Sequence, residues 1–464
     1  MPATAVEIEL PELGDASSAA VSPAVERKLG DAWLRMFRGQ VDTVQDPLLQ
    51  DYLEHVIFDL AAHSQLSEAK LRVVIVDNPT INAFAVPGGV VGINNGLLLS
   101  AEHEDELASV LAHELAHLSQ RHYARSVEEA RRNTIPNALI LLGSLVVAAT
   151  AGGGNNPMAA VAAGQAAIQQ QQLRFSRANE READRIGMQT LVDAGYNPEG
   201  MPRMFTRMLD SLRYNTRRPP EFLLSHPVTE SRVADSKNRA RNLVRDGRVD
   251  SMEFGMMRAR VRVGFDETPG FAVKRFRAEI EKDGGLSPAN RYGLVLALTK
   301  ANEFESARTE LAPLLRDHPE SIPVVLAAAE LDLAAGRAGD ALQRLGREIS
   351  LNPGNHPLTM AMAKALLTAG KAEESAALLV EHAREHGDDP QVWYELAETQ
   401  GLAGQILDVH RSRAEYFILN GALDLAERQL GYALNIAEGD FHATAGIQAR
   451  ISEVRTMRQE MKDL

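Results

Sequence analysis

The feature that most constrains the fold is a 34-residue period in the C-terminal half of the chain. Pro319 and Pro353 are 34 residues apart, and the sequence is similar around three of the recurring turn positions, as NEFESA, GRAGDA and GKAEES. The turn positions that recur at this spacing are Asn302, Gly336, Gly370 and Gly404. A fixed period of this length indicates paired helices, because one pair cannot bury its apolar face alone and stacked pairs can.

This period resembles the tetratricopeptide repeat, although the aromatic positions typical of that repeat are mostly missing. The resemblance implies an all-α superhelix over residues 266–464, with a concave groove that binds proteins or docks onto the rest of the chain. A generic helical bundle is the alternative. In either case we expect the chemistry in residues 1–265.

Residues 1–265 combine helices with a short stretch of strands. Helical periodicity near residues 20–70 gives way to β-branched segments at 71–76 and 83–93, the second interrupted by Pro87-Gly88-Gly89. Because proline is tolerated mainly at sheet edges, a strand here is expected at the edge of a small sheet. Helices are predicted again over 104–126, over 179–194 and on to about 245. The predicted fold class is therefore mainly α with a small β-sheet, followed by the helical repeats.

An HExxH motif, His113-Glu114-Leu115-Ala116-His117, lies inside the helix predicted at 104–126. Residues four apart share a helix face, so both imidazoles can point at one metal ion. Glu114 lies about 100° round the helix, where it can reach a metal-bound water without ligating the metal. With 13 histidines in the chain the motif can also arise by chance, so a third ligand is needed to support it.

The helix predicted at 179–194 offers that ligand. Glu180 and Asp184 are four residues apart on one face, whereas Glu182 lies about 200° round from Glu180. We expect Glu180 to be the third zinc ligand and Asp184 to accept a hydrogen bond that orients a ligand imidazole. The alternative is a solvated cluster of these carboxylates with neighbouring arginines.

Taken together, several segments resemble the zinc metallopeptidases of the CAAX-prenyl-protease and HtpX type. The segments are HELAH, NEREAD some sixty residues further on, Ser225-His226-Pro227 with Glu230-Ser231-Arg232, and NAFAVPGG at residues 82–89. The repeat array and the lack of long apolar segments narrow the resemblance to the periplasmic branch of that family. The implied first domain is an α+β zincin-type peptidase over residues 1–265.

For the motif residues the resemblance implies that His113, His117 and Glu180 bind one Zn²⁺ per chain and that Glu114 is the general base. The open position on the zinc is then left for water, which Glu114 deprotonates for attack on the peptide carbonyl.

The resemblance also assigns roles to His226 and Arg232. His226 is expected near the metal, as a fourth ligand in a closed state or as a stabiliser of the transition state. Arg232 is expected to help hold the developing charge of the scissile carbonyl. The alternative for His226 is a capping or surface histidine before Pro227.

Two further segments are expected to act on the substrate. An extended chain can pair with the sheet edge at Asn82, Ala83, Phe84, Ala85 and Val86, which demands little of its side chains. The resemblance implies that the segment at about 131–175 is a lid over the cleft. Its apolar run at 138–151 is shorter than the ~20 residues that cross a bilayer, so it is either a buried or lid helix or a segment that dips into a membrane surface.

Composition bears on partners and compartment. Lys and Arg number 49 against 63 Asp and Glu, with no basic block, which argues against nucleic acid. The chain has no cysteine, which excludes disulfides, a thiol nucleophile and sulfur ligands to zinc. The acidic, Ser/Ala-rich opening has no apolar signal region, so we expect a mature periplasmic protein whose signal peptide has been removed, with a cytosolic protein as the alternative.

The predicted function is that of a periplasmic zinc-dependent endopeptidase, with a chaperone-like role in the assembly and quality control of outer-membrane β-barrel proteins. The resemblance implies unfolded or misassembled outer-membrane proteins as clients and the β-barrel assembly machinery as a partner of the repeats. The alternative is a chaperone or adaptor that acts through its repeats, with the protease site largely shut by His226.

Overall fold

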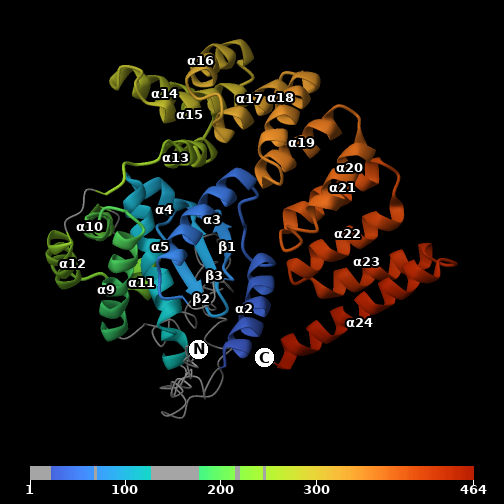
Figure 1. Cartoon of the computed structure of the whole chain (residues 1–464), viewed down its shortest axis with the longest axis horizontal. Coiled ribbons are helices and arrows are strands. Elements are labelled where there is room, and N and C mark those ends of the chain that lie inside the picture. Colours follow the sequence, from blue (N-terminus) through green and yellow to red (C-terminus); the bar gives the residue numbers. More distant parts are fainter. Residues whose placement is uncertain (1–21, 67–69, 127–176, 215–219, 244–246, 464) are drawn as a thin grey trace, which may run out of the picture.

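The computed structural model describes residues 22–66, 70–126, 177–214, 220–243 and 247–463, which form a mainly helical protein with one small sheet (Figure 1). The fold class predicted from the sequence is confirmed: helices surround the sheet in the first half, and a purely helical array follows. The expected lid at about 131–175, with the apolar run at 138–151, lies outside the described residues. Among the described helices, none combines the length and the apolar character that crossing a bilayer requires.

In the described residues the sheet has three strands in the order β1-β3-β2. β1 (Arg72–Val76) runs parallel to β3 (Val90–Asn94), and β2 (Ala83–Val86) runs antiparallel to β3 with Ala83 opposite Ile93. β2 therefore lies at an edge, as the sequence predicts. Gly88, at a φ of +85°, turns the chain between β2 and β3 so close to α2 that a Cβ there would meet the backbone oxygen of Glu26 at 2.6 Å.

The helices of the first half surround this sheet. They are α2 (Pro23–Arg38), α3 (Pro47–Ala62), α4 (Asn95–Ser100), α5 (Glu104–Ser119), α9 (Arg177–Asp193), α10 (Gly200–Tyr214), α11 (Phe222–Ser225), α12 (Glu230–Asn242) and α13 (Met252–Phe265). Ser22, Asp46 and Thr229 cap the N-termini of α2, α3 and α12 by accepting backbone N–H bonds. α5 is the central helix, because every residue from Glu104 to His117 is buried.

The helix predicted at 104–126 is interrupted. α5 ends at Ser119, Arg121 adopts a left-handed φ of +50°, and a further helical turn begins at His122. The sequence contains no glycine or proline here, so propensity alone gave no reason to expect a break. The kink folds His122 back onto His117, where the two rings are in contact at a centroid distance of 4.8 Å.

The second half is an array of paired helices. They are α14 (Pro269–Lys282), α15 (Pro288–Lys300), α16 (Phe304–Asp317), α17 (Ile322–Ala334), α18 (Ala338–Leu351), α19 (His356–Thr368), α20 (Ala372–His382), α21 (Pro390–Leu402), α22 (Ile406–Leu419), α23 (Leu423–Ile436) and α24 (Phe441–Asp463).

The turns inside these pairs explain the 34-residue period. Asn302, Gly336, Gly370 and Gly404 all have a left-handed φ, between 60° and 76°, directly after a helix. Glycine and asparagine tolerate this conformation best, so each pair must place one of them at the same position. The markers found in the sequence are thus the helix-ending turns of successive repeats.

The array curves back toward the first half, from α14 to α24 beside α2 (Figure 1). One cluster of buried apolar residues continues from α3 and α5 through α13, α15 and α17 into α19. α19 also packs against α3, and α22 against α2. Near the end of the array, Lys28 Nζ lies 3.1 Å from Glu460 Oε1.

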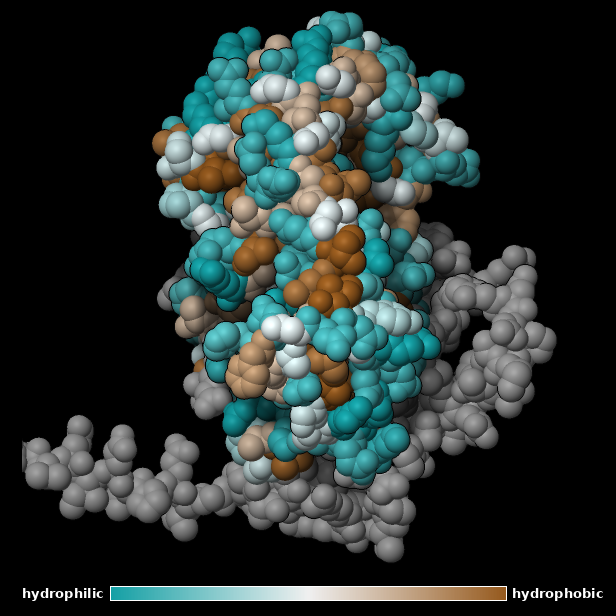
Figure 2. Space-filling model, turned by 90° about the vertical axis from the view of Figure 1, so that its right-hand side faces the viewer, coloured by the Kyte–Doolittle hydropathy of each residue, from teal (hydrophilic) through white to brown (hydrophobic). Residues whose placement is uncertain are grey.

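The face of the molecule formed by the later repeats is mostly hydrophilic, with separate apolar patches along it (Figure 2). α13, the last helix before the division predicted at residue 265, packs against α15 as well as against α3 and α4. The division into domains at that residue stays a prediction.

Candidate metal centre and active site

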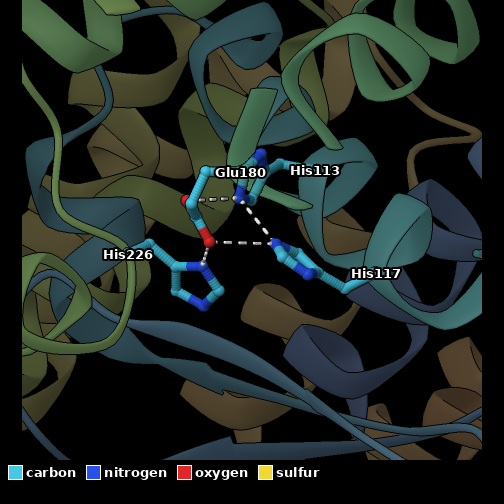
Figure 3. A group of neighbouring side chains, drawn as sticks. All are labelled: His113, His117, Glu180 and His226. Carbon is cyan, nitrogen blue, oxygen red and sulfur yellow. Dashed lines mark hydrogen bonds and ion pairs between the residues drawn. The ribbon is translucent and has the colours of Figure 1, made fainter. Parts of the chain in front are cut away.

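Three helices bring the predicted site residues together (Figure 3). α5 carries His113, Glu114 and His117, while Glu180 comes from α9 and His226 follows α11. All five side chains are buried.

Close contact between α5 and α9 sets this geometry. A Cβ on Gly187 of α9 would lie 3.0 Å from the backbone of Ala112 and His113. The missing side chain at Gly187 lets α9 approach the HExxH helix at the level of the first histidine, which places Glu180 over both imidazoles.

The four polar groups converge on one point. His113 Nε2 and His117 Nε2 are 3.0 Å apart, and the Glu180 oxygens lie 3.6 Å from His113 Nε2 and 3.5 Å from His117 Nε2. His226 Nδ1 lies 2.9 Å from Glu180 Oε1. One ligand atom from each of the four residues falls within 4.8 Å of the others.

This donor set fits a divalent transition-metal ion. Two imidazole nitrogens that face each other share at most one proton between them, and a carboxylate closes the third side. Two histidines and one glutamate are ligands that zinc uses in hydrolases, whereas Mg²⁺ and Ca²⁺ prefer sites made of oxygen. The residues present therefore fit the metal that the motif predicts.

Electrostatics of the buried cluster favour a cation. Burial raises the pKa of Glu180, but attraction to His226 and the hydrogen bond with His113 outweigh this effect and hold the pKa well below 4.5. Burial lowers the pKa of His113, but hydrogen bonds with Asp184 and Glu180 raise it to about 9. Burial and the neighbouring His113 and His226 place the pKa of His117 well below 6.5. The carboxylates thus stabilise positive charge here, while the ring of His117 stays neutral.

Asp184 lies where the sequence predicts an orienting carboxylate. Its Oδ1 is 3.1 Å from His113 Nδ1, the ring nitrogen that faces away from the cluster. Burial raises the pKa of Asp184, but hydrogen bonds with Arg232 and His113 lower it below 3.8 overall.

The sequence predicts that Arg232 contacts the scissile carbonyl of a substrate. In the structure, the guanidinium of Arg232 bonds to carboxylates of the protein. Its guanidinium donates two hydrogen bonds to Asp184, at 2.8 and 2.6 Å, and lies 2.8 Å from Glu180 Oε2. A further bond reaches the Pro227 backbone oxygen at 2.9 Å. In this conformation the guanidinium positions the two carboxylates that surround His113.

Glu114 lies between His226 and the edge strand. Its Oε1 is 3.6 Å from His226 Nε2, and the carboxylate accepts a hydrogen bond from the backbone of Ala85 in β2. Burial is the largest influence on Glu114 and raises its pKa above 4.5, against the lowering effect of His226 and His113. A raised pKa suits a group that takes and returns a proton near neutral pH.

The expected substrate strand runs beside this carboxylate. Ala83–Val86 form β2, and Asn82 precedes it. Phe84 packs its ring into a cluster with Trp33 and Phe37, at centroid distances of 5.6 Å. Because the ring of Phe84 is packed inside the protein, the edge of β2 presents its backbone groups to a partner.

Two groups around the site were not expected from the sequence. The first is Glu182, which is not among the four side chains that converge. Its Oε2 is 3.1 Å from His122 Nε2, and His122 Nδ1 is 2.9 Å from His117 Nδ1. Glu182 thus contacts His117 through His122. The sequence indicated this contact only weakly, because the contact depends on the kink at Arg121.

The second such group is Glu221, just before α11. Asparagine side chains donate to its carboxylate at 3.3–3.4 Å, from Asn78, Asn82 and Asn94. These bonds tie the segment before His226 to the ends of the strands. Nothing in the sequence around Glu221 identifies it.

Comparison with known proteins agrees with this geometry. Residues 47–240 match the model of peptidase family M48, and residues 332–398 match a tetratricopeptide repeat. The class of protein that the fold and site define is therefore an M48 metallopeptidase.

Relatives match along nearly the whole chain. The β-barrel assembly-enhancing protease of Escherichia coli is 33% identical over 457 residues, covering 98% of this chain and 92% of its own length. A putative β-barrel assembly-enhancing protease of Vibrio cholerae is 32% identical, covering 98% of this chain and 94% of its own. The mitochondrial metalloendopeptidase OMA1 of Schizosaccharomyces pombe is 31% identical over 39% of this chain and 50% of its own. The chain belongs to the β-barrel assembly-enhancing protease family, so the family predicted from its motifs is confirmed.

Proposed function

We propose that this metallopeptidase is a zinc-dependent endopeptidase that acts in the periplasm on misassembled outer-membrane β-barrel proteins. The observation that carries the proposal is the convergence of His113, His117 and Glu180 beside the buried carboxylate of Glu114. The name of the relatives supports the client class and the compartment, and the repeats support docking on clients or on the assembly machinery.

We propose His113, His117 and Glu180 as the residues that hold Zn²⁺. The ion supplies Lewis-acid chemistry, which makes a water molecule acidic enough to attack a peptide carbonyl near neutral pH. Asp184 fixes the ring orientation of His113, and Arg232 keeps Asp184 ionised in a buried setting while it also pairs with Glu180.

Glu114 is the proposed general base. It accepts the proton of the attacking water and later gives it to the leaving amine. The outer edge of β2 aligns an extended substrate through backbone hydrogen bonds, beside the Ala85 amide that contacts Glu114.

The test replaces Glu114 by Gln and measures casein cleavage and bound metal on the same preparation. We expect cleavage to fall by at least about 100-fold, because the base is lost, while the metal content stays that of the wild type. Loss of the metal together with the activity would refute the assignment of Glu114 as a base that does not bind metal.

His226 distinguishes the peptidase from the adaptor alternative. Its contacts with Glu180 and Glu114 fit either a stabiliser of the transition state or a group that closes the site. A stabiliser predicts slower casein cleavage after His226→Ala, and a plug predicts faster cleavage. An unchanged rate would contradict both roles.

A further inference from the structure

A second group of histidines lies in the repeat array, remote in sequence from the HExxH site. His356 opens α19, His382 ends α20, and His386 follows one helical turn later, with its backbone N–H bonded to the His382 oxygen at 3.1 Å. One ring nitrogen from each lies within 4.8 Å of the others. His356 and His382 are buried and His386 is half-buried.

Asp389 completes this arrangement. The Nε2 atom of His356 lies 3.3 Å from Asp389 Oδ2, while its Nδ1 faces His382 Nε2 at 2.8 Å. A carboxylate that accepts from one ring nitrogen fixes the tautomer and leaves the lone pair of the other nitrogen free for a metal. The same relation joins Asp184 to His113 in the candidate active site.

From this geometry we infer that His356, His382 and His386 form a second transition-metal site, which takes Zn²⁺ and is oriented by Asp389. Three imidazole nitrogens suit Zn²⁺ and not Mg²⁺ or Ca²⁺, which prefer oxygen ligands. Ligands about 2.0–2.1 Å from a tetrahedral ion lie roughly 3.4 Å apart, so small side-chain rotations bring the three nitrogens into place.

The charge around the cluster agrees with a bound cation. Burial and the neighbouring imidazoles lower the pKa of His382 to about 4. Burial and His356 lower the pKa of His386 below 6.5, so these two rings are neutral and can donate a lone pair at neutral pH. Asp51 and Glu54 of α3 lie close enough to His356 to be influenced by its charge.

The place of the cluster in the fold suggests its purpose. It borders a cavity of about 200 Å³ between the repeats and the first half, which Arg38, Thr43, Gln50 and Arg72 also line. The loop that carries His386 and Asp389 is held to α2 by a bond from Arg38 Nη1 to the Asp388 oxygen at 3.1 Å. An ion bound here joins α19, α20 and this loop, and so stiffens the part of the array that contacts α3 and α2.

The experiment counts zinc ions per chain after chelation and dialysis against a fixed concentration of free Zn²⁺. We expect two ions in the wild type, one in His117→Gln, one in the double variant His382→Gln/His386→Gln, and none when all three changes are combined. The exposed His442, changed to Gln, is the matched control and should leave two ions. A wild type with one ion that is lost in His117→Gln and kept in the double variant would overturn the inference.

A milder variant and a thermal measurement guard against misfolding. Asp389→Asn keeps a good cap for α21, whose Gln391 N–H bonds Asp389 Oδ1 at 2.8 Å, but weakens the acceptor for His356. We expect it to lower zinc affinity at this site about 10–100-fold. In the His117→Gln background, Zn²⁺ should raise Tm, and the rise should vanish in the double variant. If the double substitution lowers Tm by the same amount with and without Zn²⁺, the histidines act only in packing, and the inference of a metal site is overturned.

Discussion

At the scale of single residues, the neighbours of a buried side chain decide its task. Glu114 and Glu180 are both almost fully buried, yet the pKa of one is raised and that of the other is lowered. Burial dominates for Glu114, whereas contact with His113 and His226 decides the outcome for Glu180. One carboxylate is thereby prepared to exchange a proton and the other to remain charged.

The raised pKa of Glu114 predicts the acid limb of the pH–rate profile. Glu114 must be ionised to accept a proton, and its pKa lies above 4.5, so kcat/KM should rise with pH through that raised value and fall on the acid side. Metal content measured at each pH separates this effect from metal loss. An acid limb that coincides with metal release would contradict it.

The two carboxylates of NEREAD predict unequal effects on the metal. Glu180→Gln removes a proposed ligand, whereas Glu182→Gln weakens an ion pair with Arg125 and the contact that reaches His117 through His122. We expect Glu180→Gln to cost more zinc affinity, and Glu182→Gln to cost at most about 10–100-fold. Competition with a chelator measures both, and an equal loss would show that Glu180 is not the ligand.

At the scale of elements, the site depends on how closely α9 approaches α5. The contact is at Gly187, where a Cβ would already be 3.0 Å from the backbone around His113. The position of the third ligand is therefore set by the absence of a side chain two turns away on the same helix.

Gly187→Leu should push α9 from α5 and displace Glu180 from the two imidazoles. We expect a loss of stability of about 1–3 kcal/mol from overpacking, together with weaker zinc binding. Thermal unfolding and metal titration measure the two effects. Gly431 of α23 has no atom within 4 Å of its added Cβ, so Gly431→Leu is the control that should leave zinc binding unchanged and, with its higher helix propensity, should not lower stability. Zinc affinity equal to that of the wild type in Gly187→Leu would show that the helix spacing does not position the ligand.

At the scale of the whole molecule, the peptidase half and the repeats share one buried apolar cluster. Arg260 of α13 sits at this junction. Its guanidinium donates to Asp46, the cap of α3, at 2.6 Å and to Glu330 of α17 at 2.7 Å. The halves are joined by apolar packing and by this charged contact.

Arg260→Met should destabilise both halves together. It leaves the half-buried carboxylate of Asp46 without its partner, for which we expect a loss of about 1–3 kcal/mol. Calorimetry should show one transition at a lower Tm than in the wild type, while Arg428→Met, at an exposed position, should leave Tm unchanged. Two separated transitions in the wild type would contradict a shared core.

The sequence by itself determined the features that arise from local geometry. Residues four apart share a helix face, which made His113 and His117 a pair, and left-handed turns require glycine or asparagine, which made the repeats visible as a period. The break that Pro87-Gly88-Gly89 predicts in the segment 83–93 was readable for the same kind of reason, because these residues form the turn between β2 and β3.

Tertiary structure alone decided which distant groups meet. The bonds of Arg232 to Asp184 and Glu180, the contact of Glu182 with His117 through His122, and the gathering of His356, His382 and His386 all join separate elements. Such contacts depend on how whole helices pack and on a kink at Arg121 that no local propensity encodes. The chain specifies each helix from its own residues, but the distances between helices come from filling a common core.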